Sequence, residues 1–312
     1  MDNSERPSQS SAEDLPVLQR IGAGSFATIY ISHGGACAFK VVHSSESTEI
    51  IEKEYQTLSA IYLNCNTDSF FKLPRPYAFY DPSTHKLLSV KGRYGFTVET
   101  FRRIGLVTNA SYSMDRVFVL PLEFSQPIRE RYYPASFKKT SPPPSLCRLY
   151  FGKVIDDSRP SRFFNSVNFP LDLKRYTTLA NFLDMDDADK VIIGMGEMLA
   201  RLHWRGDSDG RDIEWVLGGD GYAGLSYFVI DFNQMREWGK TMEGVDTLVS
   251  AFMTNDPYYP RPRPRDPQYE IFRSAYLAEC PSEQQAHETS LAFLAGIEQE
   301  QAKRDTVAAG ST

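Results

Sequence analysis

The spacing of apolar residues changes along the chain from a strand-like to a helix-like period. Residues 15–43, 85–108 and 114–124 hold short apolar runs separated by glycine-bearing or polar turns, which predict β-strands. Between the first two regions, residues 47–63 carry apolar side chains three and four positions apart. This spacing predicts a helix with Ser47 or Thr48 as its N-cap. The front of the chain is therefore expected to be rich in β-structure.

The second half reads mostly as helices. Residues 187–206 predict a helix that ends near Gly206 and gathers its apolar residues on one face: Val191, Met195, Met198, Leu199 and Leu202. Residues 225–230 form an apolar run typical of a buried strand, which ends on Asp231, and residues 282–304 predict a closing helix. Residues 126–170, broken by prolines at 142–144, are expected to be irregular.

These patterns predict an α+β fold with two lobes. The expected divisions are a disordered N-terminus at 1–14, a β-rich N-lobe at 15–125, a basic connection and helical C-lobe at 126–301, and a disordered tail at 302–312.

Composition narrows the class of protein. The formal net charge is −6, which argues against a protein that coats DNA or other nucleic acid non-specifically. The four cysteines lack any C-x-x-C spacing, so we expect neither a disulfide framework nor a metal site. The polar N-terminus has no signal-peptide pattern, and no apolar run is long enough to span a membrane. We therefore expect a cytoplasmic protein.

Negative charge is concentrated at 205–219, between the helix at 187–206 and the apolar run at 215–217. Four acids lie within eight residues: Asp207, Asp209, Asp212 and Glu214. Some of these carboxylates could simply cap a helix and satisfy backbone donors in a tight loop, and Asp207 is the first candidate. Clustered carboxylates could also bind a guanidinium in bidentate fashion, act as a general base through a raised pKa, or hold Mg²⁺.

Four features occur in the order found in protein kinases. A Gly-rich turn at 22–27 is followed by Lys40 at a strand end, then by Glu54 (or Glu52) on the next helix, and then by the acidic loop together with the buried strand that ends on Asp231. Residues 18–235 thus resemble the protein-kinase fold, which implies a β-rich N-lobe and a mostly helical C-lobe. Several kinase motif positions differ, however, and these departures disfavour protein phosphorylation: Ala27, Ser208, Gly210, Glu214 and Asn233.

The sequence pattern "LHW…D..DIEWVLGG", followed by "FVIDFNQM" and "NDPYYPRP", resembles that of a fungal family of kinase-like proteins. That family includes the arginine-containing cyclodipeptide synthases and is sometimes labelled as zinc-finger proteins, although this chain lacks the Cys/His spacing of a zinc site. The resemblance implies an enzyme of secondary metabolism that converts arginyl-tRNA and a second aminoacyl-tRNA into a cyclic dipeptide.

The resemblance also implies roles for particular residues. Its Asp/Asp/Glu motif corresponds here to the catalytic residues Asp209, Asp212 and Glu214, with Arg211 where a further Asp might be expected. We expect four further residues to contribute to substrate binding: Asp207, Asp231, Lys40 and Glu54. The tRNA ester already carries the activation for peptide-bond formation, so no cofactor is expected.

A tRNA substrate requires a surface for phosphates. Residues 129–175 contain ten Lys and Arg against four acids, with aromatic residues interleaved. Basic residues with aromatics can hold a single-stranded acceptor end, and the candidates for this contact are Lys138, Lys139, Arg148, Arg159 and Arg162. The alternative is an irregular segment with solvated charges and buried aromatic rings.

Two other functions remain open at this stage. The first is an ATP-dependent small-molecule phosphotransferase, in which Glu214 and Asp231 hold Mg²⁺ and Asp209 orients a hydroxyl group. The second is a kinase-like binding module without chemistry.

Overall fold

A computed structural model describes residues 18–89, 95–156 and 165–310. The chain divides into two compact units: unit 1 holds residues 1–51 and 77–114, and unit 2 holds residues 52–76 and 115–312. The N-lobe predicted at 15–125 thus loses residues 52–76 and 115–125 to unit 2. The segment predicted to be disordered at 1–14 lies outside the described residues.

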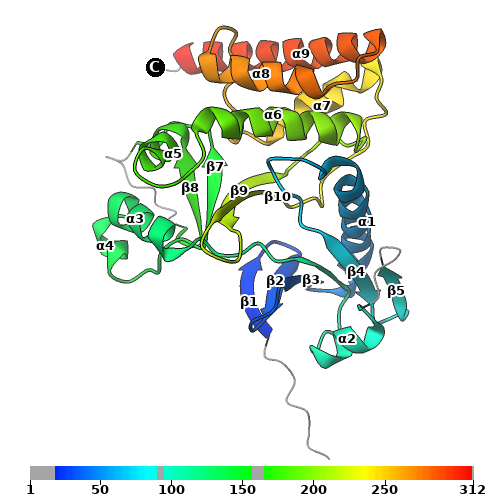
Figure 1. Cartoon of the computed structure of the whole chain (residues 1–312). Helices are drawn as coiled ribbons and strands as arrows, with labels where there is room; N and C mark the ends of the chain where they lie inside the picture. Colours follow the sequence, from blue (N-terminus) through cyan, green and yellow to red (C-terminus); the bar gives the residue numbers. More distant parts are fainter. Residues whose placement is uncertain (1–17, 90–94, 157–164, 311–312) are drawn as a thin grey trace, which may run out of the picture. The chain divides into compact units, whose positions relative to one another are not determined.

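Unit 1 is built on a sheet with strand order β1-β2-β3-β6-β4-β5, in which the pairs β1–β2, β2–β3 and β4–β5 are antiparallel (Figure 1). Its strands are β1 (Leu18–Ala23), β2 (Ala27–Ser32), β3 (Cys37–Val42), β4 (Pro76–Asp81), β5 (Lys86–Ser89) and β6 (Ser111–Asp115). The glycine-bearing turn predicted at 22–27 joins β1 to β2, and Ala23 pairs with Thr28. The β-rich character of the front of the chain is confirmed.

A helix covers part of this sheet where the sequence predicted a strand. Residues 85–108 contain α2 (Val98–Arg103), which begins at a capping box formed by Thr97 and Thr100. Because this box satisfies backbone donors at the helix start, the segment becomes helical despite its strand-like composition. Its Phe101 packs edge-on against Phe39 of β3, with ring centroids 6.2 Å apart, in the core of unit 1.

Helix α1 (Thr48–Cys65) follows a short turn, η1 (Ser45–Ser47), and matches the helix predicted at 47–63. From Glu52 onward its residues belong to unit 2. The contact between the Cys65 Sγ and the Arg201 carbonyl, 3.3 Å apart, illustrates how the end of α1 is tied into that unit.

Unit 2 contains a second sheet with strand order β10-β9-β7-β8. Its strands are β7 (Leu146–Tyr150), β8 (Asn168–Asp172), β9 (Glu214–Gly219) and β10 (Leu225–Ile230), of which β10 matches the predicted strand. β7 runs parallel to β8 and antiparallel to β9. Strand β7 therefore contributes to the middle of the sheet, although it comes from a region predicted to be irregular.

The prediction of an irregular segment at 126–170 is wrong in its described part. Besides β7 and β8, the region contains the end of α3 (Leu122–Tyr132) and all of α4 (Ala135–Lys138). Strand β7 buries only Cys147 and Leu149, a two-residue alternation too short to be recognised among the surrounding prolines. Its identity depends on pairing with β8 and β9.

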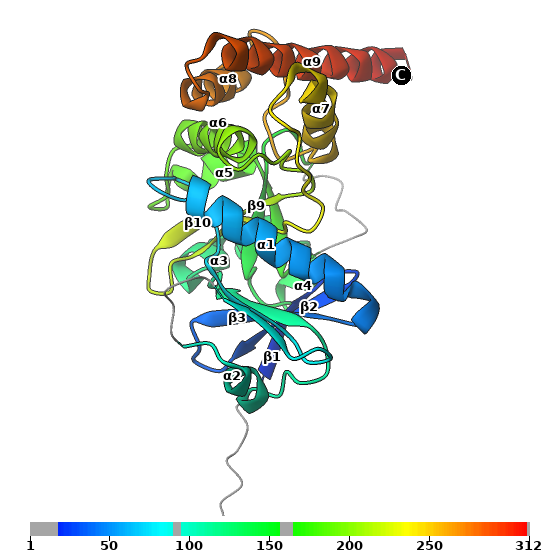
Figure 2. The same ribbon diagram turned by 90° about the vertical axis from the view of Figure 1, so that its right-hand side faces the viewer.

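The remaining helices form layers beside this sheet. They are α5 (Leu173–Ala180), α6 (Ala188–Trp204), η2 (Met242–Gly244), α7 (Val245–Thr254), α8 (Pro267–Glu279) and α9 (Gln284–Gly310). Figures 1 and 2 show α6 between the sheet and the layer formed by α7, α8 and α9. The predicted apolar face of α6 is fully buried, which confirms the amphipathic reading.

Helix α9 extends through most of the tail predicted to be disordered at 302–312. It remains helical as far as Gly310. Asp305 pairs with Arg263, and Arg304 pairs with Asp256, so the last turns are fastened to the preceding loops. Among the described helices, none combines the length and apolar character needed to cross a bilayer.

Candidate functional site

The acidic residues at 207–214 lie in the loop that joins α6 to β9 in unit 2. The backbone of this loop turns sharply: Asp207, Gly210 and Asp212 adopt φ values of +47°, +63° and +63°. The left-handed region is open to glycine but costs about 1 kcal/mol for other residues. The loop is thus wound so that neighbouring carboxylates point in different directions.

Asp209 faces the segment after β10 rather than open space. Its side chain is fully buried and accepts hydrogen bonds from the backbone N–H groups of Arg211 and Arg236, at 3.0 and 2.9 Å. It also forms an ion pair with the Arg236 Nε at 2.7 Å, and its own N–H donates to the Arg236 carbonyl. These contacts make Asp209 an anchor between two loops, although the sequence predicted a catalytic role.

Asp207 has a similar but weaker position. Its Oδ1 accepts a hydrogen bond from the Gly239 N–H at 3.2 Å. This contact agrees with the alternative in which Asp207 satisfies a backbone donor in a tight loop. The predicted role of Asp207 in substrate binding stays a prediction.

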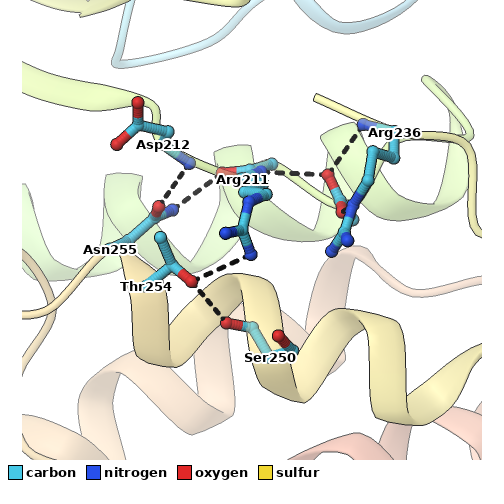
Figure 3. A network of polar contacts seen from close by, with 8 residues as sticks. Arg211, Asp212, Arg236, Ser250, Thr254 and Asn255 are labelled. Atoms are coloured by element: carbon cyan, nitrogen blue, oxygen red, sulfur yellow. Dashed lines mark hydrogen bonds and ion pairs between the residues drawn. The ribbon is translucent and has the colours of Figure 1, made fainter. Parts of the chain in front are cut away.

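Asp212 is held by residues far along the chain. Its N–H donates to the Asn255 Oδ1 at 2.6 Å, while the Asn255 Nδ2 donates to the Gly210 carbonyl at 2.7 Å (Figure 3). Gln234 donates to the Asp212 Oδ2. Burial, followed by the charge of Asp231, raises the pKa of the Asp212 carboxyl above its usual value.

Arg211 points away from that carboxylate, toward α7. Its Nη1 donates to the Thr254 Oγ1 at 3.0 Å, and Thr254 in turn donates to the Ser250 carbonyl (Figure 3). The side chains of Asp209, Arg211 and Asp212 therefore leave the loop in separate directions, so proximity in sequence does not give them a common function.

Glu214 opens β9 and forms an ion pair with Arg148 of the neighbouring strand β7. The Arg148 Nη2 and Glu214 Oε1 are 2.5 Å apart, and the side chains are 31% and 20% exposed. Burial raises the pKa of Glu214, with Asp231 and Asp212 adding to the effect, while Arg148 opposes it. Burial disfavours the charge of Arg148, yet Tyr258, Glu214 and Tyr150 outweigh it and raise the pKa of its guanidinium.

Two tyrosines complete the surroundings of this ion pair. The segment after α7 bonds to the end of β7, through Phe151 N–H to the Tyr258 carbonyl at 3.0 Å and Gly152 N–H to the Pro257 carbonyl at 2.9 Å. A Cβ at Gly152 would lie 2.3 Å from the Tyr259 carbonyl oxygen, so this close approach requires glycine. Tyr258 consequently packs edge-on against Tyr150, with centroids 5.0 Å apart.

Asp231 follows the last residue of β10 and has φ +67°. Its charge raises the pKa of both Asp212 and Glu214, and the charge of Asp212 further raises the pKa of Glu214. We call Asp212, Glu214 and Asp231 the carboxylate cluster. Neighbouring carboxylates in a partly buried position can bind a cation or accept a proton near neutral pH.

Two predicted binding residues come from the elements that precede this loop. Glu54 of α1 is buried, and its Oε1 accepts a hydrogen bond from the Phe232 N–H at 3.4 Å, directly beside Asp231. Lys40 is buried on β3 in unit 1, where its Nζ lies 5.0 Å from the centroid of the Phe26 ring.

The residues predicted to contact tRNA do not share one location. Arg148 pairs with Glu214 inside the candidate site, so its side chain is already engaged with a carboxylate. Lys138 lies on α4 and donates to the Glu130 carbonyl, and Lys139 is the C-cap of that helix. Arg159 and Arg162 lie outside the described residues.

Several residues of the site were not recognised from the sequence as contributors. Arg236 bonds to Asp209, and Gln234 bonds to Asp212. Asn255 and Tyr258 reach the same region from the segment that follows α7. The stretch "NDPYYPRP" had carried the family resemblance and contains Asn255 and Tyr258. The unusual composition of this stretch was a signal that it belongs to the site. The sequence did not, however, indicate the role of each side chain.

Comparison with known families gives one match. A family described as DUF3669, zinc finger protein, is similar to residues 227–285, which include Asp231 and the Asn255 loop. This segment contains a single cysteine, Cys280, and no histidine, so it does not fit the ligand sets of a zinc finger. Within 18–89, 95–156 and 165–310, no group of three or more His, Cys, Asp or Glu side chains is placed to hold a metal ion.

Comparison with solved structures lists "Structure of the microcompartment-associated aminopropanol kinase". The kinase is 12% identical in sequence to this chain. The match covers 94% of this chain and 93% of the kinase chain, with a TM-score of 0.25. A similarity at this level carries no argument about fold or function. No curated protein matches the chain significantly.

Proposed function

We propose that this protein is an arginine-containing cyclodipeptide synthase that acts in the cytoplasm in fungal secondary metabolism. It would use arginyl-tRNA and a second aminoacyl-tRNA to form a cyclo(Arg-X) diketopiperazine. The sequence resemblance around 202–262 suggests the activity. The observation that carries it is the carboxylate cluster, in which the pKa values of Asp212 and Glu214 are raised beside a third acid, Asp231.

The scaffold proposed for this activity is kinase-like. The support comes from the order in which its features occur along the chain. They are the turn between β1 and β2, Lys40 on β3, Glu54 on α1, the acidic loop after α6, and Asp231 after β10. The hydrogen bond from the Phe232 N–H to Glu54 adds a contact between the third and last of these features.

The chemistry consists of two acyl transfers. The α-amine of one aminoacyl-tRNA attacks the ester carbonyl of the other and loses a proton, the attacked ester bond breaks, and the tRNA that carried it leaves with its 3′-oxygen protonated. The free amine of the resulting dipeptidyl-tRNA then attacks its own ester, which closes the six-membered ring and releases the second tRNA. Each step needs a base for the ammonium proton and no ATP, because the ester supplies the driving force.

The residues divide these tasks as follows. Carboxylates of the cluster accept the planar donors of the arginine side chain, and the member that is protonated most readily takes the proton from the attacking amine. Asp209 acts indirectly, because its contacts with Arg236 keep the loop in place. Lys138, Lys139, Arg159 and Arg162 remain candidates for contact with tRNA phosphates.

The test uses purified protein and tRNA charged with arginine and a mixture of other amino acids, freed of ATP and synthetases. We expect mass spectrometry to detect a cyclic dipeptide that contains arginine. Glu214→Gln and Asp212→Asn should abolish the product, whereas Glu237→Gln, an exposed acid outside the cluster, should not. Absence of product from folded wild-type protein with intact charged tRNA would refute the proposal.

An ATP-dependent small-molecule phosphotransferase is the second candidate, with a kinase-like binding module as its inactive counterpart. The observation that favours it is the buried Glu54, which contacts the segment beside Asp231 as a kinase helix glutamate approaches its metal-binding aspartate. In this reading Asp231 and Glu214 would hold Mg²⁺. Calorimetric titration with Mg-ATP should show binding that Lys40→Met and Asp231→Asn abolish; a flat titration would exclude it.

A further inference from the structure

A cavity of unit 2 has none of the carboxylate cluster among its lining residues. It has a volume of about 460 Å³ and is bordered by the start of α3, the segment between α5 and α6, and the turn between β9 and β10. This volume is in the range of sites that hold a small ligand or one or two side chains of a partner. Its lining residues are Glu123, Phe124, Phe182, Leu183, Asp184, Met185, Asp186, Ala223, Gly224 and Leu225.

Hydrogen bonds shape two walls of this pocket. The Tyr176 hydroxyl donates to the Asp186 carbonyl at 2.7 Å and lies 2.5 Å from the Tyr227 hydroxyl. On the opposite wall, the Asp220 Oδ1 accepts hydrogen bonds from the N–H groups of Tyr222 and Gly224, at 2.7 and 3.1 Å. The first wall is thus tied to buried tyrosines of unit 2, and the second is shaped by hydrogen bonds within its own turn. A pocket shaped by hydrogen bonds in this way reduces the entropy cost of binding.

Large apolar side chains extend beyond the pocket. Leu122 is 72% exposed, Phe182 is 52% exposed and Tyr222 is 93% exposed. Exposed apolar side chains gathered around a cavity are typical of a surface that another molecule covers. Because they continue past the rim, they favour a protein segment over a compact small molecule.

The charge of the pocket selects the chemistry of that segment. Three lining residues are acids, and the lining includes neither lysine nor arginine: Glu123, Asp184 and Asp186. Lys190, in the first turn of α6, forms an ion pair with Asp186, and its Nζ lies 2.5 Å from the Asp186 Oδ1. Glu123 and Asp184 are both exposed, so an approaching cation meets two further carboxylates.

Phe182, the exposed one of the two phenylalanines in the lining, already has a guanidinium near its ring. The Arg131 Cζ lies 5.9 Å from the centroid of the Phe182 ring, and the ring remains half exposed. Arginine stacks on aromatic faces and forms bidentate contacts with carboxylates, a combination that lysine does not match.

We propose that this acidic and apolar pocket is a docking site for a short segment of a partner protein that carries arginine next to large apolar residues. The arginine would lie among Glu123, Asp184 and the Phe182 ring, and the apolar neighbours would cover Leu122 and Tyr222. The site is separate from the carboxylate cluster and does not depend on the function proposed above.

The test measures binding of a peptide that carries fluorescein on its N-terminal amine, fluoresceinyl-Leu-Arg-Phe-Arg-Leu-amide, to the full chain by fluorescence anisotropy at physiological salt. A matched peptide with citrulline in place of arginine keeps the size and loses the charge. We expect saturable binding of the arginine peptide, weakened about tenfold by the double variant E123Q/D184N and by Phe182→Ala. The control E237Q/E283Q removes two exposed acids elsewhere and should leave binding unchanged.

Melting temperatures of all variants within about 2 °C of the wild type would show that the fold is intact. Equal weakening by E123Q/D184N and E237Q/E283Q would overturn the proposal, because it would mean that only the overall charge of −6 attracts the peptide. Equally tight binding of the citrulline peptide, or the lack of saturation, would overturn it as well.

Discussion

Arg148 on β7 and Glu214 on β9 form an ion pair whose Nη2 and Oε1 atoms are 2.5 Å apart. The two strands are antiparallel neighbours in which Arg148 pairs with Val216, so Glu214 is the diagonal neighbour of Arg148 across the ladder. The sheet thus brings a guanidinium to a carboxylate 66 positions away in sequence. This relationship makes Arg148 part of the candidate site.

Replacing Arg148 by Gln should change the protonation of Glu214. Burial and the neighbouring acids already raise the pKa of Glu214, and the loss of the guanidinium removes the opposing charge. We expect the acidic limb of the pH–rate profile to move to higher pH and the free energy of unfolding to fall by about 1–3 kcal/mol. Arg148→Lys should preserve most of the profile. A tRNA contact would instead reduce the salt dependence of binding and leave the pH profile unchanged.

Asp212→Asn should separate stability from activity. Because the pKa of Asp212 is raised in the folded state, its contribution to stability is fully present below about pH 3.8 and is lost as the pH rises through the folded pKa. The neutral variant avoids this loss, and asparagine tolerates the left-handed backbone. At pH 7 we expect a melting temperature equal to or above that of the wild type, with activity reduced at least about 100-fold. A less stable variant at pH 7 would contradict this assignment.

Asn255→Ala should release the loop that carries Asp212. The buried amide bonds to the Asp212 N–H and the Gly210 carbonyl, so truncation leaves two backbone groups without these partners. We expect unfolding free energy to fall by about 2–4 kcal/mol and activity to be lost. The neighbouring Thr254→Val removes the exposed contacts of this hydroxyl with Arg211 and with the Ser250 carbonyl, and should cost less than about 1 kcal/mol. Equal effects of both variants in denaturant titrations would refute the special role of Asn255.

Asp209 and Arg236 should behave as a coupled structural pair. The Asp209 carboxylate holds both the backbone and the side chain of Arg236, and it is fully buried. Asp209→Asn should therefore reduce stability by about 2 kcal/mol, and a double-mutant cycle with Arg236→Met should show a coupling of about 1 kcal/mol. If Asp209→Asn were inactive yet as stable as the wild type, the catalytic role predicted from the sequence would be favoured instead.

His203 should make the protein sensitive to acid. Burial lowers the pKa of this imidazole from its ordinary value of 6.5 to about 3. A depressed pKa contributes stability that is present above about pH 6.5 and is lost as the pH falls toward 3. His203→Asn should therefore reduce the slope of stability against pH by about 1.4 kcal/mol per unit between pH 6 and 4. The exposed His287→Asn provides the control in calorimetry at several pH values, and equal slopes would contradict the prediction.

The sequence by itself determined the longest periodic elements. Helix α6 and strand β10 were predicted correctly because each has an uninterrupted apolar pattern that survives in any compact fold. The same reasoning located the acidic density at 207–214, since four carboxylates in eight residues are visible without a structure. In contrast, α2 and β7 escaped prediction: a capping box decided the first, and pairing with distant strands decided the second.

Only the tertiary structure separated the acids from one another. Asp209 and Asp212 are three residues apart, yet one is fastened to Arg236 and the other is held by Asn255, 43 positions away. Likewise, Glu214 meets Arg148 because β7 and β9 are adjacent in the sheet. A carboxylate's role depends on its burial and on the charges and donors around it. Those partners are set by where the chain returns in space, which local sequence patterns do not encode.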